Sequence, residues 1–91
     1  MDTVAVWRKV DGARVAEALD EARQRLAGTD REVVLDFSGV SRISPEALAA
    51  LDKLAGAAEE KSVKVALRAV TVEIYRVLKL AKLTARFTFF N

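Results

Sequence analysis

Residues 33–48 read VVLDFSGVSRISPEAL, and this stretch decides the fold class because a strand pattern passes through a polar turn into a helix start. Its apolar, β-branched beginning is typical of a strand covered on both faces, and residues 36–41 supply turn chemistry around Gly39. Ser44 and Pro45 predict a helix N-cap followed by proline at the first helical position. Since helix amino termini carry free N–H groups, we expect a turn that suits an anion or an attached phosphate.

On both sides of this stretch, the apolar periodicity predicts strands and helices in strict alternation. Short apolar runs predict strands at 3–7, 32–37, 63–67 and 86–90. Apolar spacings of three and four residues predict three helices. The first is capped by Asp11 and ends at Gly28, and the second is capped by Ser44 and fades near residue 60. The third is capped by Thr71 and reaches about residue 82. This order predicts an α/β fold, βαβαβαβ, with a small, mainly parallel sheet of about four strands and three helices packed on it.

The composition limits the function classes. With 91 residues the chain has room for one small domain, residues 1–91, and a hydrophobic fraction of 52% argues against disorder. Charges interrupt every apolar run before it reaches the roughly 20 residues of a membrane span, so we expect no membrane insertion. The chain contains no cysteine and no histidine, which removes thiol catalysis and the commonest metal ligand and general base. We therefore expect a protein that is not an enzyme and holds no metal or cofactor, and the absence of a secretory signal at its start favours the cytoplasm.

The net charge of +2 is unevenly distributed. Residues 61–91 contain seven Lys and Arg residues but only one acidic residue, Glu73. Arg76, Lys79 and Lys82 recur at helical spacing, and no aromatic pair interleaves with them as a stacking platform for bases requires. This pattern predicts a solvated helix face and no nucleic-acid partner, with an acidic protein partner as the alternative.

Residues 34–40, VLDFSGV, resemble the strand and turn of STAS domains, above all those of the bacterial anti-sigma factor antagonists. The resemblance extends from Val4 to Phe90 and includes IYRVLKLAKL at 74–83. It implies helices packed against a small sheet. Family members usually begin with an additional strand that forms a hairpin with the first strand found here, and only Met1 and Asp2 precede that strand. The missing leading strand leaves an uncovered edge, which predicts a homodimer formed through that edge strand.

In the family, the loop that follows carries an Asp-Ser-Ser-Gly-Leu type motif, whose serine before the glycine is phosphorylated by a cognate anti-sigma kinase. Here the loop reads ISPEAL at 43–48, which places Glu46 on the phosphoacceptor and Ala47 on the glycine. Glutamate cannot accept a phosphoryl group. The resemblance therefore implies a surface at 38–51 that docks an anti-sigma factor or kinase-like ATPase without the usual switch. Its predicted site residues are Asp36, Ser38, Gly39, Ser41, Ser44, Pro45, Glu46 and Leu48.

Several alternatives stay open at this point. The Glu46 carboxylate either complements the helix dipole alone or also imitates phosphoserine, and Ser44 is either the N-cap alone or an alternative phosphoacceptor. Trp7, Leu80 and Leu83 are core residues or part of an apolar contact surface. Residues 40–83 also resemble the small STAS subunit of bacterial phospholipid-transport ABC systems, whose partner is an ABC ATPase.

Overall fold

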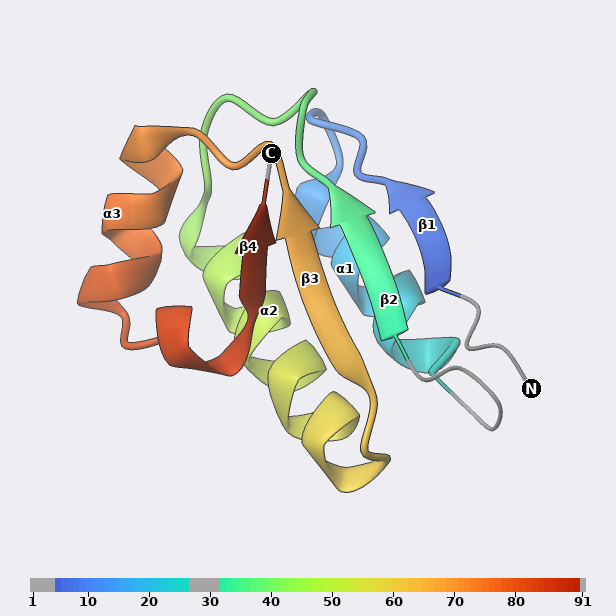
Figure 1. Cartoon of the computed structure of the whole chain (residues 1–91). Helices are drawn as coiled ribbons and strands as arrows, with labels where there is room; N and C mark the ends of the chain where they lie inside the picture. Colours follow the sequence, from blue (N-terminus) through green and yellow to red (C-terminus); the bar gives the residue numbers. More distant parts are fainter. Residues whose placement is uncertain (1–4, 27–31, 91) are drawn as a thin grey trace.

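The computed structural model describes residues 5–26 and 32–90, and its elements alternate as predicted (Figure 1). In chain order they are β1 (Ala5–Lys9), α1 (Val15–Gln24), β2 (Glu32–Asp36), α2 (Pro45–Glu60), β3 (Lys64–Arg68), α3 (Val72–Leu80), the short 3-10 helix η1 (Thr84–Arg86) and β4 (Thr88–Phe90). The four described strands form one sheet in the order β1-β2-β3-β4, and every neighbouring pair is parallel. The predicted α/β class, strand number and helix number are confirmed.

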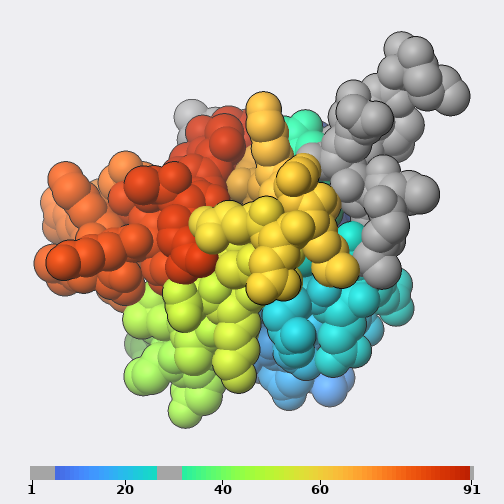
Figure 2. All heavy atoms as spheres, turned by 90° about the horizontal axis from the view of Figure 1, so that it is seen from below, coloured from blue at the N-terminus to red at the C-terminus, as the bar shows by residue number. Residues whose placement is uncertain are grey.

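The helices are unevenly placed around this sheet. Helices α1 and α2 lie side by side behind it in Figure 1, whereas α3 stands beside the edge strand β4. Figure 2, a view from below, shows the same arrangement, with α3 projecting beyond α2. The apolar side of α3 still packs against the core through Ile74 and Leu78, both of which are buried.

The strand register separates the two faces of the sheet. Val33, Val65, Leu35 and Leu67 belong to the core that α1 and α2 cover. Their chain neighbours Val34 and Ala66 point to the opposite face, because successive side chains of a strand alternate. Both are buried, as a strand covered on two faces requires, although α1 and α2 lie on the other face; the rings of Trp7 and Phe90 contact each other with centroids 6.0 Å apart.

Two of the three predicted helix caps are confirmed. The Ser44 hydroxyl accepts a hydrogen bond from the Ala47 N–H at 3.1 Å, and the Thr71 hydroxyl accepts one from the Ile74 N–H at 3.1 Å. The prediction for Asp11 is wrong, since α1 begins at Val15 and is preceded by an N-cap residue without a side-chain bond.

Asp11 instead closes the turn that precedes α1. Its carboxylate accepts from the Ala13 N–H at 2.9 Å, and its carbonyl accepts from the Arg14 N–H at 3.0 Å. These local bonds use the groups that capping would need. At its other end α1 stops at Gln24, and the predicted stop at Gly28 lies outside the described residues.

The ends of the sheet also differ from the prediction. Strand β1 extends to Lys9, two residues beyond the predicted end, and the predicted start at Thr3 lies outside the described residues. Arg86 lies in η1 and not in the last strand, because its guanidinium bonds to Asp52 at 2.6 Å and to Glu59 at 3.0 Å on α2. Leu83, just before η1, is buried, so it belongs to the core and not to a contact surface.

Candidate functional site

The predicted site residues lie at the edge of the sheet where the strands end. The chain leaves β1, β2 and β3 at this edge, and the amino termini of α1, α2 and α3 follow each loop. In parallel α/β sheets the crevice at the carboxyl ends of the strands is the usual place for binding. All eight predicted residues come from a single connection, the segment from the end of β2 to the first turn of α2.

The turn after β2 is fixed by Asp36. Its carboxylate accepts a hydrogen bond from the Ser38 N–H at 2.9 Å and a weaker one from Arg68 at 3.3 Å. A further backbone bond, from the Val40 N–H to the Phe37 carbonyl, closes the turn at 2.9 Å. The bonds from Ser38, with a smaller contribution from the Arg68 charge, hold the pKa of Asp36 below its usual value. Asp36 therefore acts as a charged turn former at neutral pH.

Gly12 is a site residue that the sequence patterns did not single out. A Cβ atom at position 12 would overlap the carbonyl oxygen of Gly39, so the loops after β1 and β2 touch backbone to backbone. Gly39 has more room, since a Cβ there would meet its nearest neighbours, from Lys9 and Val10, at 3.8 Å. The only sequence signal was the turn-forming pair of Asp11 and Gly12 between a strand and a helix.

The first turn of α2 offers little of the anion site that we expected. Pro45 has no N–H, the Ala47 N–H is bonded to the Ser44 hydroxyl, and the Leu48 N–H is bonded to the Ser44 carbonyl at 2.9 Å. Among the described residues, only the Glu46 N–H in this turn has no acceptor. The exposed Glu46 carboxylate already supplies the negative charge that the helix dipole favours. This helix start is therefore capped by Ser44 and already carries a negative side chain, which leaves it poorly suited to an additional anion.

Two hollows flank the loop between the β2 turn and α2. The larger, of about 570 Å³, lies between the starts of α1 and α2, and the smaller, of about 170 Å³, lies toward α3. Arg42 and Ile43 line both hollows and form the ridge between them. Glu17 and Glu46 line the larger hollow and Glu73 the smaller, so acidic side chains stand on both sides of this ridge. Glu17 and Glu73 were not predicted, because they lie on α1 and α3 and only the fold brings them beside this loop. Arg42 and Ile43 lie within the predicted surface at 38–51 but were not among its predicted site residues.

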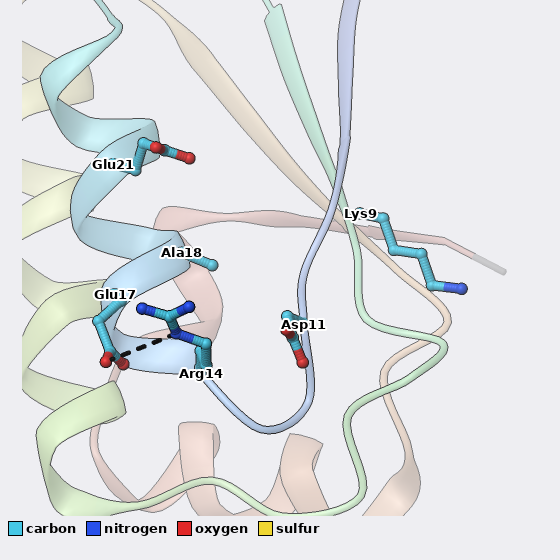
Figure 3. Close-up of a pocket in the computed structure, with 6 residues that line it drawn as sticks. All are labelled: Lys9, Asp11, Arg14, Glu17, Ala18 and Glu21. Carbon is cyan, nitrogen blue, oxygen red and sulfur yellow. Dashed lines mark ion pairs between the residues drawn. The ribbon is translucent and has the colours of Figure 1, made fainter.

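A third hollow, of about 290 Å³, continues this surface along α1 (Figure 3). It is lined by Lys9, Asp11, Arg14, Glu17, Ala18 and Glu21. Figure 3 shows Arg14 directed toward Glu17, at 3.9 Å between Nε and Oε2, and Glu17 also lines the larger hollow. Within residues 5–26 and 32–90, no group of three acidic residues could hold a metal ion. No helix of this part of the chain has the length and apolar character needed to cross a membrane.

A protein-family model described as "Mlab, STAS domain" matches residues 2–88. No curated protein matches the chain with significance. A crystal structure of a sulfate transporter family protein from Wolinella succinogenes is similar, with a TM-score of 0.77, 17% identity, and coverage of 98% of this chain and 80% of that one. A protein from Thermotoga maritima described as a putative anti-sigma factor antagonist has a TM-score of 0.73 and 16% identity, with 99% and 83% of the two chains covered. At these identities the solved structures show a shared fold.

Proposed function

Because this chain belongs to the STAS domain family, we propose that it is a protein-binding regulatory module of the anti-sigma factor antagonist type, docking its partner through residues 38–51. STAS domains are in general binding modules and not enzymes. The structure from Thermotoga maritima supports the choice of this type, since it shares the fold and carries that description. The proposed partner is an anti-sigma factor or kinase-like ATPase in the bacterial cytoplasm.

One observation carries the proposal: an exposed carboxylate, Glu46, stands in the first turn of α2, at the position that the family resemblance assigns to the phosphoacceptor. Ser38, Ser41 and Ser44 are exposed on the same segment. Beneath them lie Val40 and Ala47, which are fully buried. An exposed polar turn on a buried support needs little ordering when a partner binds, which favours affinity.

The charges around the turn indicate the chemistry of the partner. Glu17, Glu46 and Glu73 surround the ridge formed by Arg42 and Ile43, so the surface presents more negative than positive groups near its centre. A basic patch with an apolar contact for Ile43 would complement it. Complementary charge of this kind mainly sets specificity and the rate of association.

The same turn explains why we propose constitutive binding without a phosphorylation switch. A carboxylate has one charge and two acceptor oxygens, whereas phosphoserine has about −1.5 to −2 charge and three such oxygens. Glu46 thus imitates the charge and the hydrogen-bond acceptors of phosphoserine only in part. Ser44 carries the nearest hydroxyl, but its oxygen already accepts the capping bond from Ala47.

The proposal is tested by a pull-down under native conditions with two charge-reversed variants. Glu46→Arg changes the proposed docking turn, and Glu60→Arg makes the same change at the exposed far end of the same helix. We expect a histidine-kinase-like ATPase to be retained by the native protein and by Glu60→Arg, and to be lost with Glu46→Arg. Equal retention by both variants would place the contact elsewhere.

The absence of a switch is tested with the retained kinase and ATP. We expect no labelling of the native protein, and labelling at the new hydroxyl in Glu46→Ser. Labelling of the native protein at Ser44 would show that the chain is switchable through its alternative phosphoacceptor.

A second candidate is the STAS accessory subunit of a phospholipid-transport ABC system. A fixed carboxylate in place of a phosphoacceptor suits a permanently assembled subunit as well as it suits an unswitched antagonist. The similar structure from Wolinella succinogenes is described as a sulfate transporter family protein, so the fold also occurs in a transporter family. Retention of an ABC ATPase in the same pull-down would favour this candidate over the first.

A further inference from the structure

The face of the sheet that points away from α1 and α2 is open. Figure 1 looks onto this face, and no described helix lies in front of the strands. The middle row of side chains on it comes from Trp7, Val34, Ala66 and Thr88, which are register partners on the four strands. Trp7 is 58% exposed, and Phe90, two residues after Thr88, is 39% exposed.

The apolar centre of this face is buried, but the two aromatic residues on the face, Trp7 and Phe90, remain exposed. The rings of Trp7 and Phe90 meet above it with centroids 6.0 Å apart, and beneath them Val34 and Ala66 are 3% and 2% exposed. The outer surfaces of both rings stay in water. A sheet with one apolar face in water is the kind of surface that a second sheet covers in sandwich folds, with the strands nearly aligned.

The charges on either side of this centre follow a simple rule. Glu32 on β2 is the register partner of Lys64 on β3, and Asp36 on β2 is the register partner of Arg68 on β3. In both of these rows the acidic residue lies on β2 and a basic residue lies on β3, and the row of Asp36 has a second basic residue, Lys9, on β1. The face is self-complementary if β2 of one copy is stacked over β3 of another.

We propose that this open face is the interface of a homodimer, in which two sheets stack face to face about a two-fold axis parallel to the strands. An axis between β2 and β3 brings Glu32 over Lys64 of the second copy and Asp36 over Arg68 of the second copy. An axis perpendicular to the strands would instead bring Glu32 over Asp36 and Lys64 over Arg68, which repel. The charge pattern therefore selects one of the two symmetric stackings.

The size of the face indicates that this dimer is weak. Four strands about 4.8 Å apart and about five residues long cover roughly 19 by 17 Å in projection. This is well below the roughly 800 Å² per partner of a standard stable interface. We expect a dimer that dissociates on dilution, with a dissociation constant in the micromolar range or weaker.

The first test is sedimentation equilibrium of the native protein over a concentration series up to about 1 mM. We expect the mean mass to rise from the 10.0 kDa of one chain toward twice that value. A mass of one chain throughout the series would overturn the proposal.

The second test uses Glu32→Lys and Lys64→Glu. Each variant alone places like charges over each other in the proposed dimer, so each should associate at least tenfold more weakly than the native protein. In an equimolar mixture, the lysine introduced in one variant lies over the glutamate introduced in the other. The unchanged Lys64 of the first variant then lies over the unchanged Glu32 of the second. Association should therefore return on mixing, an outcome that damage to folding cannot produce.

Dimerisation through β1, the edge strand of the described sheet, would give a different result. The side chains of Glu32 and Lys64 stand on strands that do not form this edge, so the two variants would associate like the native protein. Association that neither variant weakens, or that does not return on mixing, would overturn stacking of the open face.

Discussion

The Trp7 indole and the Phe90 ring meet edge to face, although their strands lie at opposite edges of the sheet. Strands β2 and β3 lie between them, so their backbones are roughly 14 Å apart at the usual strand spacing. Both side chains must therefore extend inward across the face of the sheet that carries Val34 and Ala66. The contact links the two edge strands through their side chains.

We expect this contact to stabilise the fold measurably. Trp7→Ala and Phe90→Ala should each lower the free energy of unfolding by about 1 to 2 kcal/mol, and a double-mutant cycle should give a coupling of about 0.5 to 1.5 kcal/mol. The measurement is urea unfolding at low protein concentration, where self-association does not contribute. Trp7 is the only tryptophan, so Phe90→Ala should also shift its fluorescence to longer wavelength. A coupling near zero would mean that the rings do not pack in solution.

The contact between the loops after β1 and β2 should make Gly12 intolerant of a side chain. In Gly12→Ala the added methyl would overlap the Gly39 carbonyl, which is backbone and cannot move without displacing the turn. We expect a loss of about 2 kcal/mol or more in urea unfolding. Gly39→Ala is the matched control, because its methyl would have no neighbour closer than 3.8 Å, and its change should stay within about 0.5 kcal/mol. Equal effects of the two substitutions would contradict the backbone contact.

The parts of the fold that could be predicted from the sequence are those determined by local chemistry. The Ser44 cap and the proline after it fixed the start of α2, and Thr71 fixed the start of α3, because each cap bonds to an N–H three residues later. Strict alternation of strands and helices then required a parallel sheet. Asp11 shows the limit of this reasoning, since the same residue type can cap a helix or close a turn.

What could not be predicted depends on contacts between distant segments. Glu17 and Glu73 belong to the candidate site because α1 and α3 bring them beside Arg42 and Ile43 of the predicted surface at 38–51, and no spacing in the sequence indicates this. The sequence pattern placed Arg86 in the last strand, but in the structure it lies in η1, where it forms ion pairs with two carboxylates of α2. Trp7 had two interpretations, and only the position of Phe90 shows that it lies on the outer face.

Asp36 should make the protein sensitive to acid. Its pKa in the folded state is lowered by the bonds from Ser38 and by the Arg68 charge, so its contribution to stability is full above its ordinary pKa and is lost as the pH falls through the folded value. That window lies below about pH 4. Asp36→Asn should therefore be less stable than the native protein at neutral pH, and the difference should shrink in acid. Urea unfolding at neutral pH and near pH 3 checks this, and a difference that does not depend on pH would contradict it.

Asp20 and Glu59 should preserve some acid sensitivity in the Asp36→Asn variant. The pKa of Asp20 is lowered first by its bond from Arg23, and the pKa of Glu59 is lowered first by its bond from Arg86. The sign of their linkage is the same as for Asp36. The variant should therefore still lose stability in acid, with a smaller total change than the native protein.

Gly56 offers the opposite kind of prediction, a substitution that stabilises. It lies in the interior of α2, where glycine costs about 0.5 to 1 kcal/mol relative to alanine. A Cβ atom there would have Arg86 Nη2 as its nearest neighbour at 3.8 Å, an ordinary van der Waals contact that leaves the ion pairs of Arg86 intact. Gly56→Ala should thus raise the free energy of unfolding by about 0.5 to 1 kcal/mol in urea titrations. Ala49→Gly, at an exposed position of the same helix, should lower it by a similar amount of about 1 kcal/mol. If Gly56→Ala destabilised the protein while Ala49→Gly behaved as expected, the helix propensity argument would hold and the space beside Gly56 would be smaller than the structure shows.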